Sequence, residues 1–242
     1  MTVYFVSDLH LKPERPDLTR AFSRLLDTTF QDASELYLLG DIFEAWIGDD
    51  TPTPTLEPIF NSLKQLSDQG CKVFFQHGNR DFLVGEAFAN SINASLLPEE
   101  LTVDLPVGKA VISHGDQLCL DDIEYMQFRT MVRNPQWQQD FLSKSLEERL
   151  AIARQIRDAS KERTAEKAEY ITDVNQQAVT DLFIRSGVDL MIHGHTHRPC
   201  IHQHEVDGKQ ATRIVLGDWD KLGWYLKVDK QGYDLINFPI EG

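Results

Sequence analysis

The stretch VYFVSDLH at residues 3–10 places four apolar residues directly before a Ser-Asp-Leu-His cluster. A short run of β-branched and aromatic residues that ends in polar residues is typical of a buried strand. The same arrangement recurs four times, at 36–41 (LYLLGD), 73–81 (VFFQHGNRD), 110–116 (AVISHGD) and 190–197 (LMIHGHTH). Since the carboxyl ends of strands in an α/β sheet meet at one edge, where ligands bind, the five clusters predict one shared site.

Helical patterns alternate with these strands. Apolar residues at helical spacing occur near 18–31, 56–70, 84–91 and 173–186, whereas 212–216, 224–228 and 234–238 look like antiparallel strands joined by Gly-containing turns. We therefore predict an α/β protein with mixed sheets. The chain has 242 residues, 41% of them hydrophobic, and no Pro/Gly/Ser-rich linker, so residues 1–242 are expected to form a single domain.

One stretch, at about 121–168, departs from this alternation because long helical patterns replace the strands there. Tyr125 and Phe128 lie on one face of the first of these patterns. Such an insertion either packs as ordinary satellite helices or forms a cap whose aromatic residues bind an apolar ligand. Seven Lys/Arg residues outnumber five Asp/Glu residues at 144–167. These cations either line a solvated helix face or meet phosphate or an anionic membrane surface.

The charge and the cysteines narrow the function further. A formal net charge of -14 argues against binding to nucleic acid, which needs clustered Lys and Arg. It does not exclude a small anionic substrate, since bound divalent cations would dominate the local field. Cys71, Cys119 and Cys200 show no CxxC spacing and are expected to be free thiols in a reducing compartment. No apolar run approaches the roughly 20 residues that span a bilayer, and no leader pattern is visible, so we expect a cytoplasmic protein.

The residue types in the five clusters point to metal binding, although each cluster alone is more often a turn or a hydrogen-bonded pair. Asp8 and His10 are two residues apart, which in a strand aims both side chains at one ion. His195 and His197 either do the same or turn to different ions where the strand loosens. Asp41 is central in the order and can bridge two ions. Carboxylates and imidazoles without thiolates suit Mn, Fe, Zn or Co better than a Mg site made wholly of oxygens.

Taken together, Asp8-X-His10, Gly40-Asp41, Gly78-Asn79-Arg80, His114-Gly115-Asp116 and Gly194-His195-Thr196-His197 resemble the signature of the calcineurin-like metallophosphoesterases over nearly the whole chain. The resemblance implies an αββα sandwich of mixed sheets with a helical cap, and two divalent cations, for which we expect Mn²⁺. It assigns one ion to Asp8, His10, Asp41 and His197, and the other to Asp41, Asn79, His114 and His195. It also implies that Asp41, Asn79, Arg80, His114 and His195 carry the reaction.

Three longer stretches, SDLHL at 7–11, LGDIFEAWIGDD at 39–50 and HGNRDFL at 77–83, resemble the UDP-2,3-diacylglucosamine hydrolases of bacterial lipid A biosynthesis. This implies attack by a metal-activated hydroxide on the phosphate next to uridine, which gives UMP and 2,3-diacylglucosamine 1-phosphate. It also implies peripheral contact with the cytoplasmic face of the inner membrane. The substrate-binding residues implied by the resemblance are Asn79, Arg80, Asp122, Ser160, Thr164, Lys167 and His195. Some relatives are expected to carry Asn where Thr164 stands.

Several alternatives remain at this stage. Arg80 either clamps the pyrophosphate or forms a salt bridge with Asp81 or Asp116. His77 and His193 either support the metal ligands or belong to the core. A metallophosphoesterase with a soluble nucleotide or phosphoprotein substrate would carry a polar cap, and an interaction module of the same fold would have lost ligands, whereas none is lost here. The metal, the acyl-chain preference and the oligomeric state stay open.

Overall fold

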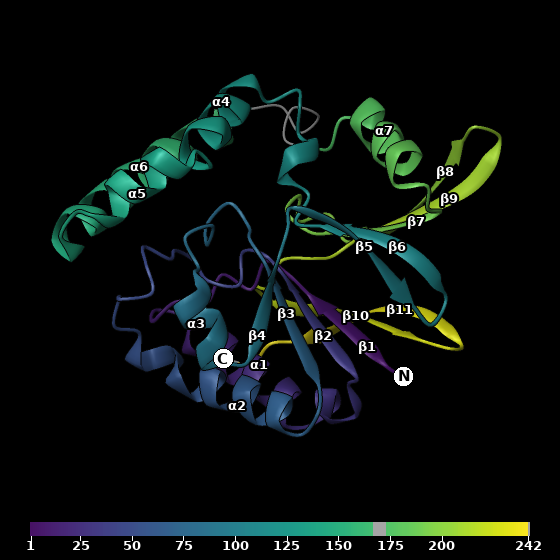
Figure 1. Cartoon of the computed structure of the whole chain (residues 1–242), viewed down its shortest axis with the longest axis horizontal. Helices are drawn as coiled ribbons and strands as arrows, with labels where there is room; N and C mark the ends of the chain where they lie inside the picture. Colours follow the sequence, from purple (N-terminus) through teal and green to yellow (C-terminus); the bar gives the residue numbers. More distant parts are fainter. Residues whose placement is uncertain (167–172, 242) are drawn as a thin grey trace.

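A computed structural model describes residues 1–166 and 173–241, except for the side chains of 159–166. It shows two sheets packed face to face (Figure 1). The first sheet has the order β11-β10-β1-β2-β3-β4. Its strands are β1 (Val3–Val6), β2 (Glu35–Leu39), β3 (Lys72–Gln76), β4 (Ala94–Leu97), β10 (Leu222–Asp229) and β11 (Gly232–Pro239). The β1–β4 pairings are parallel and those of β10 with β1 and β11 are antiparallel, so the sheet is mixed.

The second sheet has the order β5-β6-β7-β9-β8. Its strands are β5 (Glu100–Leu105), β6 (Gly108–Ser113), β7 (Leu190–His193), β8 (Cys200–Val206) and β9 (Lys209–Val215). The pairs β6–β7 and β7–β9 are parallel, whereas the two edge strands pair antiparallel. The predicted α/β class with mixed sheets is therefore confirmed.

Alternation of side chains along each strand builds the layers. In β1, Tyr4 and Val6 belong to the cluster that faces the helices, whereas Val3 and Phe5 belong to the cluster between the two sheets. In β6, Ile112 points between the sheets and Val111 points to the opposite side. Both faces of the central strands are thus buried, which explains why these strands appear in the sequence as nearly continuous apolar runs.

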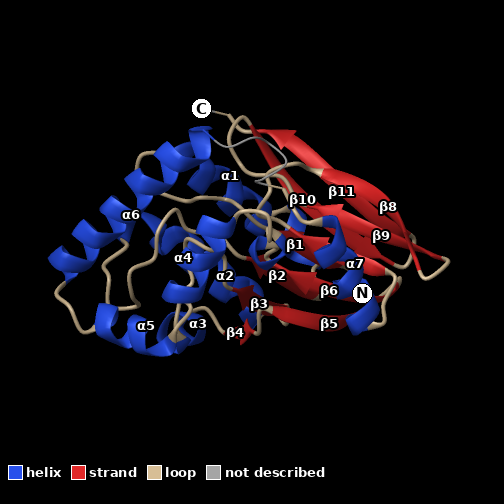
Figure 2. Ribbon diagram, turned by 90° about the horizontal axis from the view of Figure 1, so that it is seen from above, coloured by secondary structure: helices blue, strands red, loops and turns tan. Residues whose placement is uncertain are grey.

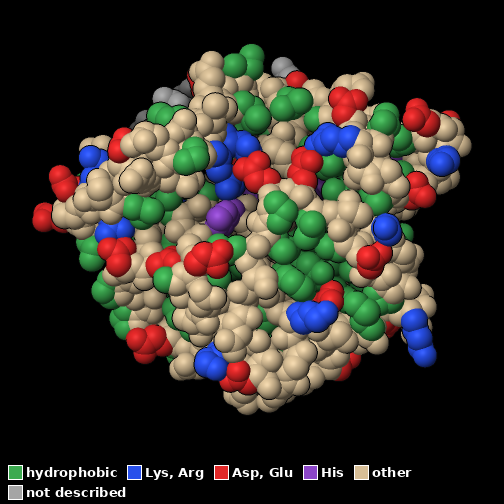
Figure 3. All heavy atoms as spheres, in the orientation of Figure 1, with side chains coloured by type: hydrophobic (Ala, Val, Ile, Leu, Met, Phe, Trp, Pro, Cys, Tyr) green, Lys and Arg blue, Asp and Glu red, His purple; other side chains and the backbone are tan. Residues whose placement is uncertain are grey.

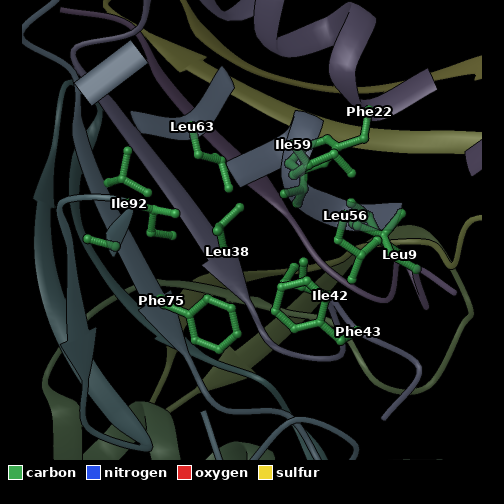
Figure 4. Close-up of a cluster of buried hydrophobic side chains, with 14 of the residues drawn as sticks. Leu9, Phe22, Leu38, Ile42, Phe43, Leu56, Ile59, Leu63, Phe75 and Ile92 are labelled. Carbon is green, nitrogen blue, oxygen red and sulfur yellow. The ribbon is translucent and has the colours of Figure 1, made fainter. Parts of the chain in front are cut away.

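Helices cover the two outer faces, which completes the αββα arrangement (Figures 1 and 2). The helices on the first sheet are α1 (Pro16–Asp27), α2 (Glu57–Asp68) and α3 (Glu86–Ser91), and α7 (Gln176–Ser186) covers the second. Figure 4 shows the first of these interfaces, where Phe43 and Phe75 lie among aliphatic side chains. Burial of one such ring contributes about 1.5–3 kcal/mol.

Three further helices, α4 (Ile123–Val132), α5 (Pro135–Leu142) and α6 (Leu146–Glu166), lie together to one side of the sheets (Figure 1). They occupy most of the stretch that lacks a strand pattern, and we refer to α4–α6 as the cap helices. Asn134 caps the start of α5 through hydrogen bonds from the backbone N–H groups of the next turn. Phe141 and half-buried Trp137 pack against the core cluster that contains Trp46. No helix among the described residues is long and apolar enough to cross a membrane.

Three strands escape the sequence patterns. β4 is a short strand at the edge of the first sheet, whereas β5 and β8 form the two edges of the second sheet. β5 alternates polar with apolar residues, and β8 is mostly polar, with His-Gln-His-Glu at 202–205. The expected antiparallel tail is also only partly right. β10 and β11 do form a hairpin, but β9 pairs with β8 and β7 in the other sheet. His202 and His204 lie on β8, where both side chains are partly buried.

Candidate metal centre

The candidate ligands lie on loops that follow β1, β2 and β3 of one sheet and β6 and β7 of the other. Seven described non-glycine residues have positive φ, and five of them are candidate ligands, namely Asp8 (55°), His10 (49°), Asp41 (53°), His195 (68°) and His197 (57°). This left-handed conformation is uncommon outside glycine, and it gathers at functional sites where surrounding structure holds it in place. The expected strand alternation for Asp8 and His10 was wrong, because β1 ends at Val6 and the loop backbone aims both side chains.

The first group of ligand atoms comes from Asp8, His10 and His197, all within 4.8 Å of one another. Nε2 of His10 lies 3.3 Å from Nε2 of His197, which is 3.4 Å from Oδ1 of Asp8. Oδ2 of Asp8 accepts hydrogen bonds from Ser7 Oγ (2.6 Å) and the His195 backbone N–H (2.9 Å). Oδ1 of this fully buried carboxylate has no hydrogen-bond partner among the residues that the structure describes. A cation between these atoms would satisfy that oxygen, so the group fits a metal.

The second group contains Asp8, Asp41 and His114, and Asn79 and His195 adjoin it. Nδ1 of His114 lies 2.8 Å from the Leu39 carbonyl, which can only accept, so this nitrogen carries the proton. In the neutral ring Nε2 is then a lone pair, and it faces the side-chain oxygen of Asn79 at 3.0 Å. Burial alone would lower the pKa of His114, but the carboxylates of Asp41 and Asp8 outweigh it and raise this pKa, so in the metal-free chain a proton on Nε2 meets the Asn79 oxygen. A bound cation would take the place of that proton. Asp8 is the residue shared by both groups, whereas the bridging role of Asp41 stays a prediction.

Two glycines of the clusters are required because candidate-ligand carboxylates lie very close to their Cα atoms, and not only because the chain turns there. A Cβ atom on Gly78 would lie 2.1 Å from Oδ1 of Asp41, and one on Gly194 would lie 2.3 Å from Oδ2 of Asp8. Both distances are far below van der Waals contact. Any side chain at either position would therefore displace a candidate ligand.

Asp81 has a role that the sequence patterns did not reveal. It is fully buried and accepts hydrogen bonds from the backbone N–H groups of Gly78 (2.8 Å), Ile42 (2.8 Å) and Asp41 (3.2 Å). It thereby ties the loop after β2 to the loop after β3, which carry Asp41 and Asn79. Arg80 does not pair with Asp81 or Asp116, because its guanidinium lies 3.5 Å from Asp41 and 3.4 Å from Glu44.

Burial and neighbouring charges set the protonation of the ligands in the metal-free chain. Burial and the charge of His114 lower the pKa of His195 to about 4, so this imidazole is neutral at pH 7. Burial alone would lower the pKa of His197, but contact with Asp8 outweighs it and raises the pKa to about 9. Burial, with the nearby charges of Asp81 and Asp8, raises the pKa of Asp41 to about 7. Cation binding must displace the protons that remain.

A pocket of about 390 Å³ leads from this centre to the cap helices. Asn79, Arg80 and Glu44 line its polar end, and the other end is lined by side chains of the cap helices that include Phe128, Trp137, Phe141, Ala153 and Ile156. Figure 3 shows histidine atoms in the hollow beside the cap helices, with acidic and basic side chains around them. The arrangement suits a ligand with a charged group at the centre and an apolar group under the cap.

The remaining predicted substrate-binding residues lie on the cap helices or directly beside them in the sequence. Asp122 caps the start of α4, where it accepts a hydrogen bond from the backbone N–H of Tyr125. Ser160 and Thr164 lie in α6, but their side chains are outside the described ones. Lys167 is outside the described residues altogether. Substrate contact by these four residues stays a prediction.

His77, His193 and Asp116 are not candidate ligands, and each contacts other groups of the protein. His77 contacts the carbonyl of Val84 at 2.7 Å, and buried His193 lies between the Gly194 carbonyl and the guanidinium of Arg213. Asp116 accepts hydrogen bonds from Tyr125 Oη (2.7 Å) and Arg129 Nε (2.8 Å) of α4. It therefore fixes the first cap helix to the centre, while the Leu39 carbonyl orients His114.

The cap helices are also fixed to the core by two arginines of α6. Buried Arg149 donates to the Ile47 carbonyl (2.7 Å) and to Asp50 (2.8 and 2.5 Å). Arg157 donates to the Glu44 carbonyl (2.8 Å) and forms an ion pair with the Glu44 carboxylate. Neither arginine belongs to a solvated helix face, so their positive charge is used to hold the cap helices against the loop at 44–50.

Comparison with known proteins supports the same chemistry. The model of the calcineurin-like phosphoesterase family matches residues 1–199. The UDP-2,3-diacylglucosamine hydrolase of Stenotrophomonas maltophilia strain K279a is 48% identical over 248 residues and covers 100% of both chains. The enzymes of the same name from Azotobacter vinelandii strain DJ and Tolumonas auensis strain DSM 9187 are each 46% identical over 241 residues. The first alignment covers 100% of both chains, and the second covers 99% of this chain and 98% of its relative.

Proposed function

Because this chain belongs to the calcineurin-like phosphoesterases, and within them to the UDP-2,3-diacylglucosamine hydrolases, we propose that it hydrolyses the pyrophosphate bond of UDP-2,3-diacylglucosamine in lipid A biosynthesis. The products would be UMP and 2,3-diacylglucosamine 1-phosphate. The observation that carries the proposal is the pocket, which joins Asn79 and Arg80 at the candidate metal centre to aromatic and aliphatic side chains of the cap helices. A substrate that is anionic at one end and diacylated at the other matches both ends.

Two divalent cations fit the residues of the centre. One would be held by Asp8, His10, Asp41 and His197, and the other by Asp41, Asn79, His114 and His195. Such a pair lowers the pKa of a water molecule and polarises a phosphoryl oxygen. We propose Mn²⁺ for both positions, because the set mixes imidazole with carboxylate and amide oxygens and contains no thiolate.

The chain's own residues position the substrate. Arg80 is one-third exposed and lines the pocket beside the candidate ligand Asn79, so its guanidinium can donate to two oxygens of the pyrophosphate in a bidentate contact. The ring of Tyr125 lies 5.7 Å from that of His195, and its hydroxyl is held by Asp116. The ring of Tyr125 thereby closes the side of the candidate metal centre that α4 covers. The leaving group is a phosphate monoester, which needs little protonation, so no strong general acid is required.

The cap helices select for the acyl chains. Each methylene that enters an apolar site contributes about 0.8 kcal/mol, so burial of a few methylenes favours a lipid substrate more than tenfold over a soluble nucleotide. A phosphoesterase that acts on a soluble substrate would gain nothing from Trp137, Phe141 and Ile156 at this position.

Peripheral contact with the cytoplasmic face of the inner membrane belongs to the same proposal. Large apolar side chains are exposed on or beside the cap helices, namely Leu120 (47%), Ile123 (67%), Met131 (46%), Leu142 (41%) and Leu150 (43%). Figure 3 shows hydrophobic atoms exposed on this part of the surface. Exposed apolar side chains on or beside the cap helices would let the protein contact the bilayer that holds the substrate.

A substrate comparison tests the proposal. Purified protein with Mn²⁺ should release UMP from UDP-2,3-diacylglucosamine and should leave diadenosine polyphosphates largely intact. Asp41→Ala should abolish turnover, whereas Asp104→Ala, which changes an exposed carboxylate on β5, should leave it unchanged. Efficient cleavage of the diadenosine compounds without release of UMP from the lipid nucleotide would overturn the proposed substrate.

A further inference from the structure

Glu44 lies between the candidate metal centre and the cap helices, and no motif singles it out as a ligand. Its side chain is largely buried, with 17% exposure. Oε2 lies 3.5 Å from Nδ1 of His10 and 3.4 Å from Nη1 of Arg80. Oε1 forms an ion pair with Arg157 of α6 and lies 3.5 Å from Nζ of Lys12. One carboxylate thus meets a candidate ligand, the candidate pyrophosphate clamp and a cap helix.

The carboxylate of Glu44 is placed to accept a hydrogen bond from the ring nitrogen of His10 that would not bind the cation. Nε2 of His10 faces Nε2 of His197 in the first ligand group, so a cation bound there leaves the ring proton on Nδ1. Nδ1 is buried and has no hydrogen-bond partner among the described residues, and Glu44 is the carboxylate that faces it. Metal-binding imidazoles usually donate their second N–H to such a group, which fixes the tautomer and the orientation of the ring.

The contact with Arg157 gives the same residue a second connection. Arg157 binds both the side chain and the backbone carbonyl of Glu44, so α6 contacts the residue that also lies beside His10 and Arg80. The other arginine of α6 at this interface, Arg149, binds Asp50, which is not in either ligand group. The two pairs therefore hold the same helix, but only one of them touches the centre.

We propose that Glu44 is a positioning residue that orients His10 for the first cation and, through Arg157, joins the seating of the cap helices to the integrity of that metal position. This rests on the proposed function only in that the centre binds divalent cations. Loss of the Glu44 carboxylate then weakens one of two cation positions and loosens the cap, whereas loss of the Asp50 carboxylate loosens the cap alone.

Direct measurement of Mn²⁺ binding tests this inference without any turnover. Calorimetric titration of the metal-free full chain should resolve two Mn²⁺ ions in the wild type. In Glu44→Ala, the affinity of one position should fall by about 10- to 100-fold, as is usual when the partner of a metal-bound imidazole is removed. Glu44→Gln, which keeps the shape and an acceptor oxygen, should show a smaller loss, and it keeps the test valid if the alanine variant fails to fold.

Asp50→Ala is the matched control, since it removes a second carboxylate that forms an ion pair with an arginine of α6. Limited trypsin digestion should cut the cap helices faster in both Asp50→Ala and Glu44→Ala, but only Glu44→Ala should lose Mn²⁺ affinity. Equal Mn²⁺ affinity in the wild type and in both Glu44 variants would overturn the inference, as would an equal loss in Asp50→Ala. Failure of the wild type to bind two ions would instead count against the proposed function.

Discussion

Asp81 offers the sharpest test of how the fold builds the centre, because it is no candidate ligand yet ties two ligand loops together. Asp81→Ala removes the acceptor of two short hydrogen bonds from buried backbone N–H groups, those of Gly78 and Ile42, and of a longer one from Asp41. A buried donor left without a partner costs about 1–3 kcal/mol, so the two short bonds alone correspond to about 2–6 kcal/mol. This is a large share of the roughly 5–15 kcal/mol that stabilises a typical domain.

Urea unfolding of the metal-free chain measures the first consequence, and Mn²⁺ titration at a temperature where the variant is folded measures the second. We expect Asp81→Ala to unfold at markedly lower urea and to bind Mn²⁺ more weakly, since the loops of Asp41 and Asn79 lose their common anchor. Asp49→Ala is a matched control, because Asp49 accepts three hydrogen bonds of 2.9 Å, from Trp46 Nε1 and the backbone N–H groups of Gly85 and Phe88. It should lose stability but keep its Mn²⁺ affinity. An unchanged urea midpoint and unchanged Mn²⁺ affinity in Asp81→Ala would refute the reasoning.

Three further outcomes are expected. Mn²⁺ affinity should rise between pH 6 and 9 with release of protons, because Asp41 and His197 must both deprotonate to bind the ion. Burial raises the pKa of Asp41 to about 7, and for His197 the contact with Asp8 outweighs burial and raises the pKa to about 9. Calorimetry in buffers of different ionisation enthalpy would measure the released protons, and a pH-independent affinity would contradict the prediction. Gly78→Ala should hold fewer than two Mn²⁺ per chain by elemental analysis, since its Cβ atom would lie 2.1 Å from Asp41 Oδ1; a full complement of metal would show that the loop tolerates the methyl group. Trp137→Ala should raise the KM for the diacylated substrate by about 10- to 100-fold, which corresponds to the loss of about 1.5–3 kcal/mol of apolar burial. The Mn²⁺ affinity of this variant should not change. An unchanged KM would show that the pocket does not bind the acyl chains.

The fold was predictable where burial on both faces makes a strand entirely apolar. β1 at Val3–Val6 coincides with the apolar run that precedes Asp8, and β2, β3, β6 and β7 extend their runs by no more than two residues at either end. β5 was missed because an edge strand with one exposed face shows only a short alternation of polar and apolar residues, and β8 could not be delimited because four consecutive polar residues fill its centre. The assignment of β9 and β10 to different sheets depends on long-range pairing, which no local pattern encodes.

The order of the five clusters was enough to nominate the residues that the fold brings together, but it did not show how they are aimed. The left-handed backbone of Asp8 and His10 replaces the expected strand alternation, and it arises from contacts between loops that are distant in the sequence. Asp81 and Glu44 were missed for a related reason. Each acts through backbone groups or through the side chains of other elements, so its importance depends on tertiary structure rather than on spacing along the chain.

Hydrolysis of UDP-2,3-diacylglucosamine in water enriched in ¹⁸O, followed by mass spectrometry of both products, tests the central claim most directly. The proposed reaction predicts one ¹⁸O atom in UMP and none in 2,3-diacylglucosamine 1-phosphate, since water attacks the phosphate next to uridine. Label in the lipid phosphate would contradict the position of attack, and the absence of both products in the presence of Mn²⁺ would contradict the function itself.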